Sequence, residues 1–127
     1  MAKGIKDLLA EARTRVREIT AADAAKLLAK RDDVLFLDVR EAEELAGGRI
    51  PGALHLPRGL LEPKAAADSP LREPQLADPG RAVVVYCASG ARSLLAADVL
   101  GVLGFRDVCS LAGGFGSWKS GGYPVAE

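Results

Sequence analysis

The sequence has few of the residues that form disulfide frameworks or metal centres. Its 127 residues include only two cysteines, Cys87 and Cys109, and a single histidine, His55. Two cysteines so far apart give neither several bridges nor the paired Cys-x-x-Cys ligands of a zinc site. A lone imidazole without a cluster of further ligands also argues against a metal. We therefore expect both thiols to be free, as in a reducing cytoplasm, and no bound metal.

The chain also lacks an excess of charge of either sign and any long apolar run. Lys plus Arg and Asp plus Glu each number 17, so no basic surplus is present to hold a nucleic acid or an anionic membrane. No apolar run approaches the length of a bilayer span. Residues 1–16 mix charges of both signs and lack the apolar core of a signal peptide. These absences predict a cytoplasmic protein without nucleic-acid or membrane partners.

Apolar runs and helical periodicities alternate along most of the chain. Val34–Val39 and Ala82–Tyr86 are nearly continuous apolar runs, which is the pattern of strands covered on both faces. Strands that alternate with helices predict a parallel α/β sheet. Further strands are expected over 53–56 and 107–111. Helices are expected from the Thr20 cap to Arg31, over 41–46 and over 115–119. Another helix is expected to end at Gly104, with an apolar face made of Leu95, Val99, Val102 and Leu103.

Two segments depart from this alternation. Residues 57–81 are rich in proline and have little periodicity, so we expect a long surface connection with one helical turn near Leu60 or Leu71. Residues 1–17 are expected to form an amphipathic helical extension ahead of a domain that spans 18–127. The apolar face of this helix could pack on its own core, which we favour, or on a second copy. The chain is accordingly expected to be a monomer or a weak homodimer.

The turn after the strand 82–86 contains the strongest candidate for chemistry. Cys87 stands at the carboxyl end of that strand, where parallel α/β sheets place their active crevice. The next four residues, Ala88, Ser89, Gly90 and Ala91, are small enough for a tight loop, in which Gly90 can adopt a positive φ. Converging backbone N–H groups and the following helix predict an anion cradle, and Arg92 adds a permanent positive charge. A thiol in this setting is expected to have a lowered pKa and to act as a nucleophile.

The second cysteine has a different sequence context. Cys109 lies inside the expected strand 107–111 and fits a small buried hydrophobic residue. The loop at Cys87 is compatible with two reactions, phosphoryl transfer through a cysteine and sulfur transfer through a persulfide. The residues alone leave both open.

Four motifs in order give the sequence a resemblance to the rhodanese-like family of sulfurtransferases, from about Ile19 to Val125. They are Asp38-Val39-Arg40 with Glu41 and Glu44, Arg49-Ile50-Pro51-Gly52-Ala53, Cys87 to Ser93, and Leu111-Ala112-Gly113-Gly114 followed by Trp118. Many members of the family have histidine where this chain has Arg49. The resemblance implies a three-layer α/β/α fold around a central, mainly parallel five-stranded sheet.

The resemblance also implies a reaction. The related phosphatases have Cys-x5-Arg, whereas Cys87 and Arg92 are separated by four residues, and the smaller ring suits a persulfide. The Cys87 thiolate would attack thiosulfate and release sulfite, and the N–H groups of residues 88–92 would hold the persulfide until cyanide or a thiol removes its outer sulfur. Arg92 would help to hold the anionic donor. No metal or organic cofactor is required.

Other motif residues are expected to support this loop. Asp38, at the end of a neighbouring strand, is expected to accept hydrogen bonds from the loop. Arg40 is expected to pair with Glu41, Glu44 or another carboxylate. Arg58 is expected near the same rim, either solvated or in contact with the donor. Gly113, Gly114 and Trp118 are expected to serve close backbone approach and core packing.

Two function classes follow from these residues. The first is an active single-domain sulfurtransferase acting on small-molecule donors and acceptors. The second is a sulfur-relay or sensor module that passes a persulfide to one sulfur-acceptor protein. An inactive binding domain is disfavoured because Cys87 and its loop are intact. Phosphatase or arsenate reductase activity is the least favoured enzyme class, because of the loop length. A Cys-His protease would depend on His55 alone, and we expect this histidine to have a structural role. The stretch from Gly113 to Lys119 is not the dinucleotide motif G-x-G-x-x-G, because Lys119 occupies its last position.

Overall fold

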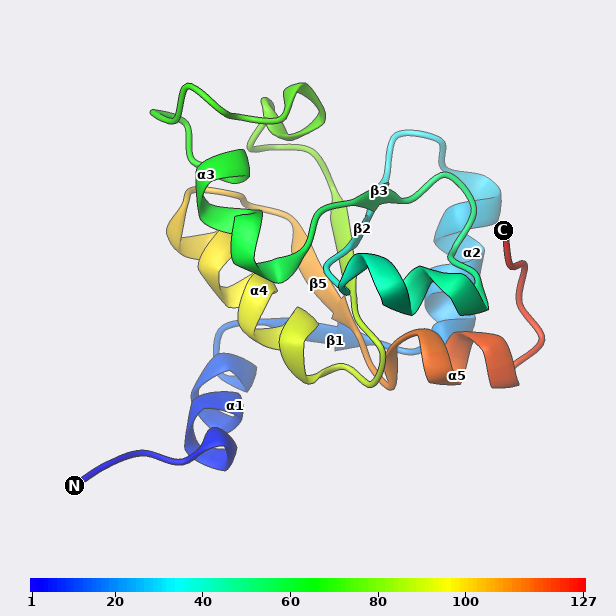
Figure 1. The fold of residues 1–127 in the computed structure, drawn as a ribbon, viewed down its shortest axis with the longest axis horizontal. Helices are drawn as coiled ribbons and strands as arrows, with labels where there is room; N and C mark the ends of the chain where they lie inside the picture. Colours follow the sequence, from blue (N-terminus) through cyan, green and yellow to red (C-terminus); the bar gives the residue numbers. More distant parts are fainter.

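Five parallel strands form the centre of the computed structural model, which describes residues 1–127 (Figure 1). Their order across the sheet is β1-β5-β4-β2-β3, and every neighbouring pair is parallel. The apolar runs at the centre of the sheet are buried throughout, as expected for strands covered on both faces. The strands are β1 (Arg17–Ile19), β2 (Leu35–Asp38), β3 (Leu54–His55), β4 (Val83–Tyr86) and β5 (Val108–Leu111).

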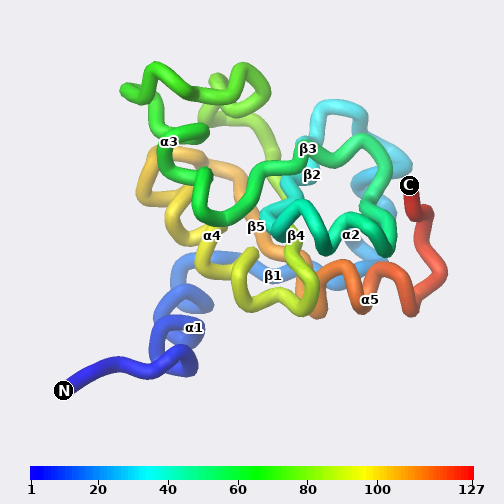
Figure 2. Tube along the Cα trace, in the orientation of Figure 1, coloured from blue at the N-terminus to red at the C-terminus, as the bar shows by residue number.

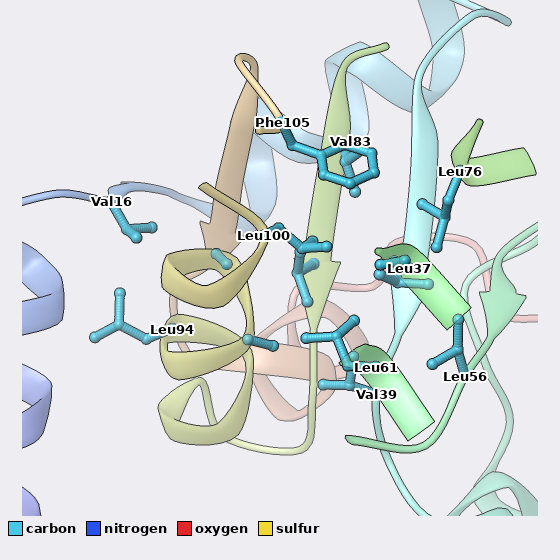
Figure 3. Packing of buried hydrophobic residues seen from close by; sticks show 14 of the residues in the cluster. Val16, Leu37, Val39, Leu56, Leu61, Leu76, Val83, Leu94, Leu100 and Phe105 are labelled. Atoms are coloured by element: carbon cyan, nitrogen blue, oxygen red, sulfur yellow. The ribbon is translucent and has the colours of Figure 1, made fainter. Parts of the chain in front are cut away.

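Helices cover both faces of this sheet, which confirms the three-layer α/β/α expectation. On one face α1, α3 and α4 pack over Leu37 and Val85, and on the other α2 and α5 pack over Phe36 and Tyr86. Figure 3 shows the first of these cores, in which Leu37, Val83 and Leu100 lie between sheet and helices. The helices are α1 (Ile5–Arg13), α2 (Ala21–Lys30), α3 (Leu61–Ala65), α4 (Ala91–Val102) and α5 (Gly114–Ser120), with short 3-10 helices η1 (Ala42–Gly47), η2 (Arg58–Leu60) and η3 (Pro74–Leu76).

Several local signals in the sequence are confirmed. Thr20 caps α2, because its side chain accepts a hydrogen bond from the N–H of Asp23 at 3.1 Å. The helical segment expected over 41–46 is present as the 3-10 helix η1, which Gly48 ends with a φ of 102°. Trp118 is fully buried, and its indole N–H donates to the carbonyl oxygen of Pro124 at 2.7 Å. These local patterns therefore predict the start of α2, the helical segment at η1 and the burial of Trp118.

The predicted apolar face of α4 is partly wrong. Leu94, Ala97 and Leu100 are among the residues that face the core, whereas Val102 is 82% exposed. Leu95, Val99 and Leu103 lie only half-buried against the same cluster. The reason is that α4 is covered on two sides, by the sheet and by α1. Such a helix is apolar around most of its circumference, so its periodicity does not indicate one face.

The connection over residues 57–81 is more ordered than expected. It contains η2, α3 and η3, and Leu61 and Leu76 are fully buried in the core. Leu71, one of the two positions expected to be near a helical turn, is exposed and outside any helix. Figure 2 traces this segment, in green, from β3 past α3 and back to β4. The segment is therefore part of the wall of the core.

The N-terminal helix lies on the molecule's own core. Ala12 is fully buried, and Arg15 forms an ion pair with Asp98 of α4 at 2.7 Å. Ile5 and Leu8, on the other side of α1, remain exposed. The division of the chain between residues 17 and 18 stays a prediction. None of the helices is long and apolar enough to cross a membrane.

Candidate active site

The loop between β4 and α4 wraps around the sulfur atom of Cys87. The Sγ atom accepts hydrogen bonds from the backbone N–H groups of Gly90, at 3.1 Å, and Ser93, at 3.3 Å. Gly90 adopts a φ of 108° at the N-cap of α4, which a residue with a Cβ adopts only under strain. Cys87 is buried, while Ala88 and Ser89 are exposed and Ala91 is half-buried. The sulfur therefore lies beneath a thin loop of small residues.

The N-terminus of α5 holds this loop from outside. The N–H groups of Phe115 and Gly116 donate to the carbonyl oxygens of Cys87, at 2.8 Å, and Ala88, at 3.1 Å. Gly114 makes this approach possible, because a Cβ there would lie only 2.5 Å from the Cys87 carbonyl oxygen. The expected close-approach role is thereby confirmed for Gly114. Because the carbonyl oxygens of Cys87 and Ala88 are bonded to α5, the backbone of the loop is held with its N–H groups directed toward the sulfur.

Two buried hydroxyl groups extend the network around the sulfur. The Oγ atom of Ser93 lies 3.5 Å from Cys87 Sγ and 2.8 Å from the Oγ atom of Ser110. Both serines are fully buried. Ser110 reaches this position because it pairs with Val85 in the sheet and shares the face covered by α4. The sequence motif contains Ser93 without indicating its role, and only the strand register reveals Ser110.

These contacts act on the pKa of the Cys87 thiol in opposite directions. Burial raises the pKa, but the hydrogen bond with the Ser93 side chain and the hydrogen bonds from the N–H groups of Ser93, Gly90 and Ser89 together lower it below its ordinary value. Burial raises the pKa of the Cys109 thiol, which lies on the opposite face of the sheet. Of the two thiols, Cys87 is therefore the one prepared to act as a nucleophile.

The arginine at the end of the loop is paired with a carboxylate. Both Nη atoms of Arg92 donate to the two carboxylate oxygens of Glu44 in η1, at 2.7 and 2.8 Å. These hydrogen bonds from Arg92 lower the pKa of Glu44 to about 2, so the pair stays ionised at neutral pH. Glu44 also accepts the N–H of Glu41 at 2.7 Å, which fixes it at the start of η1. The sequence did not indicate this partner for Arg92.

Asp38 does not support the loop in the way expected. Both of its carboxylate oxygens accept hydrogen bonds from Arg40, with the shortest side-chain contact at 2.8 Å, and both side chains are buried. The expected contact of Asp38 with the active loop is therefore wrong, because the adjacent guanidinium occupies its oxygens. Arg40 in turn donates to the carbonyl oxygens of Glu44 and Gly48 and lies over the ring of Phe115. The pair thus fixes η1, the element that carries Glu44.

The remaining polar candidates are also occupied. Arg58 at the start of η2 donates to Glu62 at 3.1 Å, in a half-exposed pair one helical turn apart. His55 lies in β3, and its Nε2 atom donates to the carbonyl oxygen of Arg40 at 2.7 Å. This contact confirms the expected structural role of His55. No group of three or more His, Cys, Asp or Glu side chains converges as metal ligands would.

Comparison with known proteins defines the family of this chain. The chain belongs to the rhodanese-like family, because the model of the rhodanese-like domain matches residues 20–121. It is 38% identical over 110 residues to a protein from Allochromatium vinosum named sulfurtransferase, spanning 87% of this chain and 94% of that relative. It is 34% identical to the thiosulfate sulfurtransferase GlpE of Coxiella burnetii, over 82% of this chain and 88% of the relative. These relatives support sulfur transfer of the rhodanese type as the class of activity.

Solved structures show the same fold. A protein of unknown function from Rhodopseudomonas palustris, described as a possible tyrosine phosphatase, superposes with a TM-score of 0.94 at 36% identity, over 99% of this chain and 96% of that one. A rhodanese-related protein from Thermoplasma volcanium superposes with a TM-score of 0.70 at 31% identity, over 87% and 97% of the two chains. The first similarity extends across the N-terminal helix as well as the sheet.

Proposed function

We propose that this chain is a sulfurtransferase that moves a sulfane sulfur from thiosulfate or a persulfide donor to cyanide or a thiol through a persulfide on Cys87. The observation that carries this proposal is the position of Cys87 Sγ, which accepts two backbone N–H groups at the end of the central strand. The same hydrogen bonds lower the pKa of the thiol and supply a nucleophilic thiolate.

In the first half-reaction, the Cys87 thiolate attacks the outer sulfur of thiosulfate. A bond forms between Cys87 Sγ and the outer sulfur, and the sulfur–sulfur bond of thiosulfate breaks. The electron pair of the broken bond stays on the inner sulfur, which leaves as sulfite. The product is a Cys87 persulfide with its negative charge on the outer sulfur. N–H groups of residues 88–92, already fixed by the bonds from α5, would stabilise that charge without rearranging.

In the second half-reaction, an acceptor nucleophile attacks the outer sulfur of the persulfide. Cyanide would form thiocyanate, and an acceptor thiolate would form its own persulfide. The electron pair of the broken sulfur–sulfur bond returns to Cys87 as a thiolate. Ala88 and Ser89 are exposed above the sulfur, so an acceptor approaches over small side chains. Neither half-reaction requires a metal or a cofactor.

A second function is favoured by the charges around the loop. Arg92 and Arg58, the two arginines considered for the donor, are each paired with a carboxylate, and so is Arg40. A site without an unpaired guanidinium among these residues suits a relay in which a sulfur-acceptor protein takes the persulfide and thiosulfate turnover is slow. Phosphoryl transfer is not proposed, because the four-residue spacing between Cys87 and Arg92 makes a ring smaller than that of the related phosphatases.

A thiocyanate assay with matched cysteine variants tests the proposal. Wild type is expected to form thiocyanate from thiosulfate and cyanide, or from an organic persulfide and cyanide. Cys87→Ser is expected to lose this activity entirely, while Cys109→Ser retains it because that thiol lies on the other face of the sheet. Activity that survives in Cys87→Ser, or that is absent from wild type with both donors, would refute the proposal.

A further inference from the structure

Glu44 is the acidic group bound to the cationic side chain of the Cys87 loop. It uses both carboxylate oxygens on the two Nη atoms of Arg92, at 2.7 and 2.8 Å. The pair is only partly buried, with 38% of the Arg92 side chain and 29% of the Glu44 side chain exposed. The pair therefore lies at the protein surface, and the Arg92 guanidinium is near enough to Cys87 for the charge of the thiolate to raise the pKa of Arg92. The positive charge that the sequence places at the end of the loop is locally neutralised.

The other arginines of the region do not replace that charge. Asp38 neutralises Arg40 inside the protein, and Glu62 pairs with Arg58. A dianionic donor that approaches the Cys87 thiolate would therefore meet two negative groups, the thiolate and Glu44, and one guanidinium already engaged. The loop N–H groups remain, and they stabilise a single negative charge on sulfur. This arrangement accommodates one negative charge better than two.

We propose that Glu44 is a specificity-determining residue that shields Arg92 and selects against dianionic sulfur donors in favour of monoanionic or neutral ones. This inference rests on the proposed sulfur transfer and names its donor class. Thiosulfate, with two negative charges, would be a slow donor. Thiosulfonates and persulfides of thiols, which present fewer charges at the reacting sulfur, would be faster.

The selection follows from how Coulomb energy scales with charge. At one position in the site, removal of the negative charge of Glu44 changes the energy of a dianion by twice as much as that of a monoanion. The change in the logarithm of the rate should therefore also be twice as large. Methanethiosulfonate provides the matched monoanion, because Cys87 attacks its terminal sulfur and expels methanesulfinate as it expels sulfite from thiosulfate. The two donors thus undergo the same bond exchange with different charge.

The variant Glu44→Gln removes the charge and retains a hydrogen-bond acceptor for Arg92 and for the N–H of Glu41. We expect kcat/KM to rise about tenfold with thiosulfate and about threefold with methanethiosulfonate, as charge scaling requires. Both increases should shrink as salt is added, because the pair is partly exposed. Glu43→Gln is the matched control, since it removes the same charge from an exposed position of η1, and it should change neither rate more than about twofold.

Alkylation of Cys87 separates this inference from the proposed function. Iodoacetate and iodoacetamide modify the same thiolate by the same chemistry and differ by one negative charge. The alkylation rate of Cys87 with each reagent is measured by peptide mass spectrometry. Because both reagents react with the same thiolate, the ratio of the two rates does not depend on the thiol pKa. Glu44→Gln should raise the ratio of iodoacetate to iodoacetamide about threefold. That result with no sulfur transfer in wild type would refute the proposed function and uphold the charge selection. An unchanged or lower ratio would overturn the inference, as would a fall in kcat/KM for thiosulfate.

Discussion

Replacement of Ser93 by alanine should raise the pKa of the Cys87 thiol, because it removes one of the hydrogen bonds that stabilise the thiolate. The Ser93 hydroxyl lies 3.5 Å from Sγ, and its hydrogen bond lowers the pKa of the buried thiol. A hydrogen bond to a charged group contributes about 1.5–3 kcal/mol to the stability of the charged form. The contact is long for an O–H donor, so the lower end of that range applies. The N–H donors of Gly90 and Ser93 remain in the variant.

Thiolate absorbance as a function of pH measures this pKa directly. Because the folded pKa of wild type is lowered, its thiolate persists to lower pH, and Ser93→Ala should lose thiolate and alkylation rate first at the acidic side of the titration. Ser89→Ala is the matched control, since it removes an exposed hydroxyl from the same loop and keeps the backbone N–H. An unchanged Cys87 pKa in Ser93→Ala would refute the stabilising role of the hydroxyl.

Three further predictions concern the framework of the site. Gly114→Ala should destabilise the fold by about 2 kcal/mol or more in denaturant unfolding, because its Cβ would meet a loop carbonyl at 2.5 Å; a stable variant would contradict the close approach. Asp38→Ala should cost about 3–5 kcal/mol, because it leaves the buried Arg40 guanidinium without its partner, and a cost below 1 kcal/mol would contradict that pairing. In α4, Leu100→Ala should cost about 2–5 kcal/mol and Val102→Ala less than about 0.5 kcal/mol; similar costs would contradict the observed helix face.

The parts of the fold predicted from sequence are those determined by uninterrupted local patterns. The buried strands β2 and β4 follow from apolar runs that contain few polar residues. The fifth strand, β1, was not located from the sequence. It has only three residues, two of them charged, and it forms because it pairs with β5 at the edge of the sheet. No local pattern distinguishes such a segment from a loop, so its pairing is a property of the tertiary structure.

The site likewise contains residues that are contiguous in the sequence, which could be predicted, and partners from other elements, which could not. Cys87, its small loop residues and Gly90 are contiguous, so the anion cradle could be predicted from one stretch of sequence. The partners of that loop are not contiguous. Glu44 comes from η1, Ser110 from β5, and the supporting N–H groups from α5. Which carboxylate pairs with which arginine depends on distances between elements, so Asp38 binds Arg40 and not the loop, and Glu44 binds Arg92.

The most direct test of the central claim is intact-protein mass spectrometry after brief exposure to thiosulfate and, in parallel, to an organic persulfide. Wild type is expected to gain the mass of one sulfur atom, cyanide is expected to remove it as thiocyanate, and Cys87→Ser is expected to gain nothing. A gain of sulfur that persists in Cys87→Ser would place the chemistry elsewhere. The absence of any gain in wild type with both donors would contradict a Cys87 persulfide.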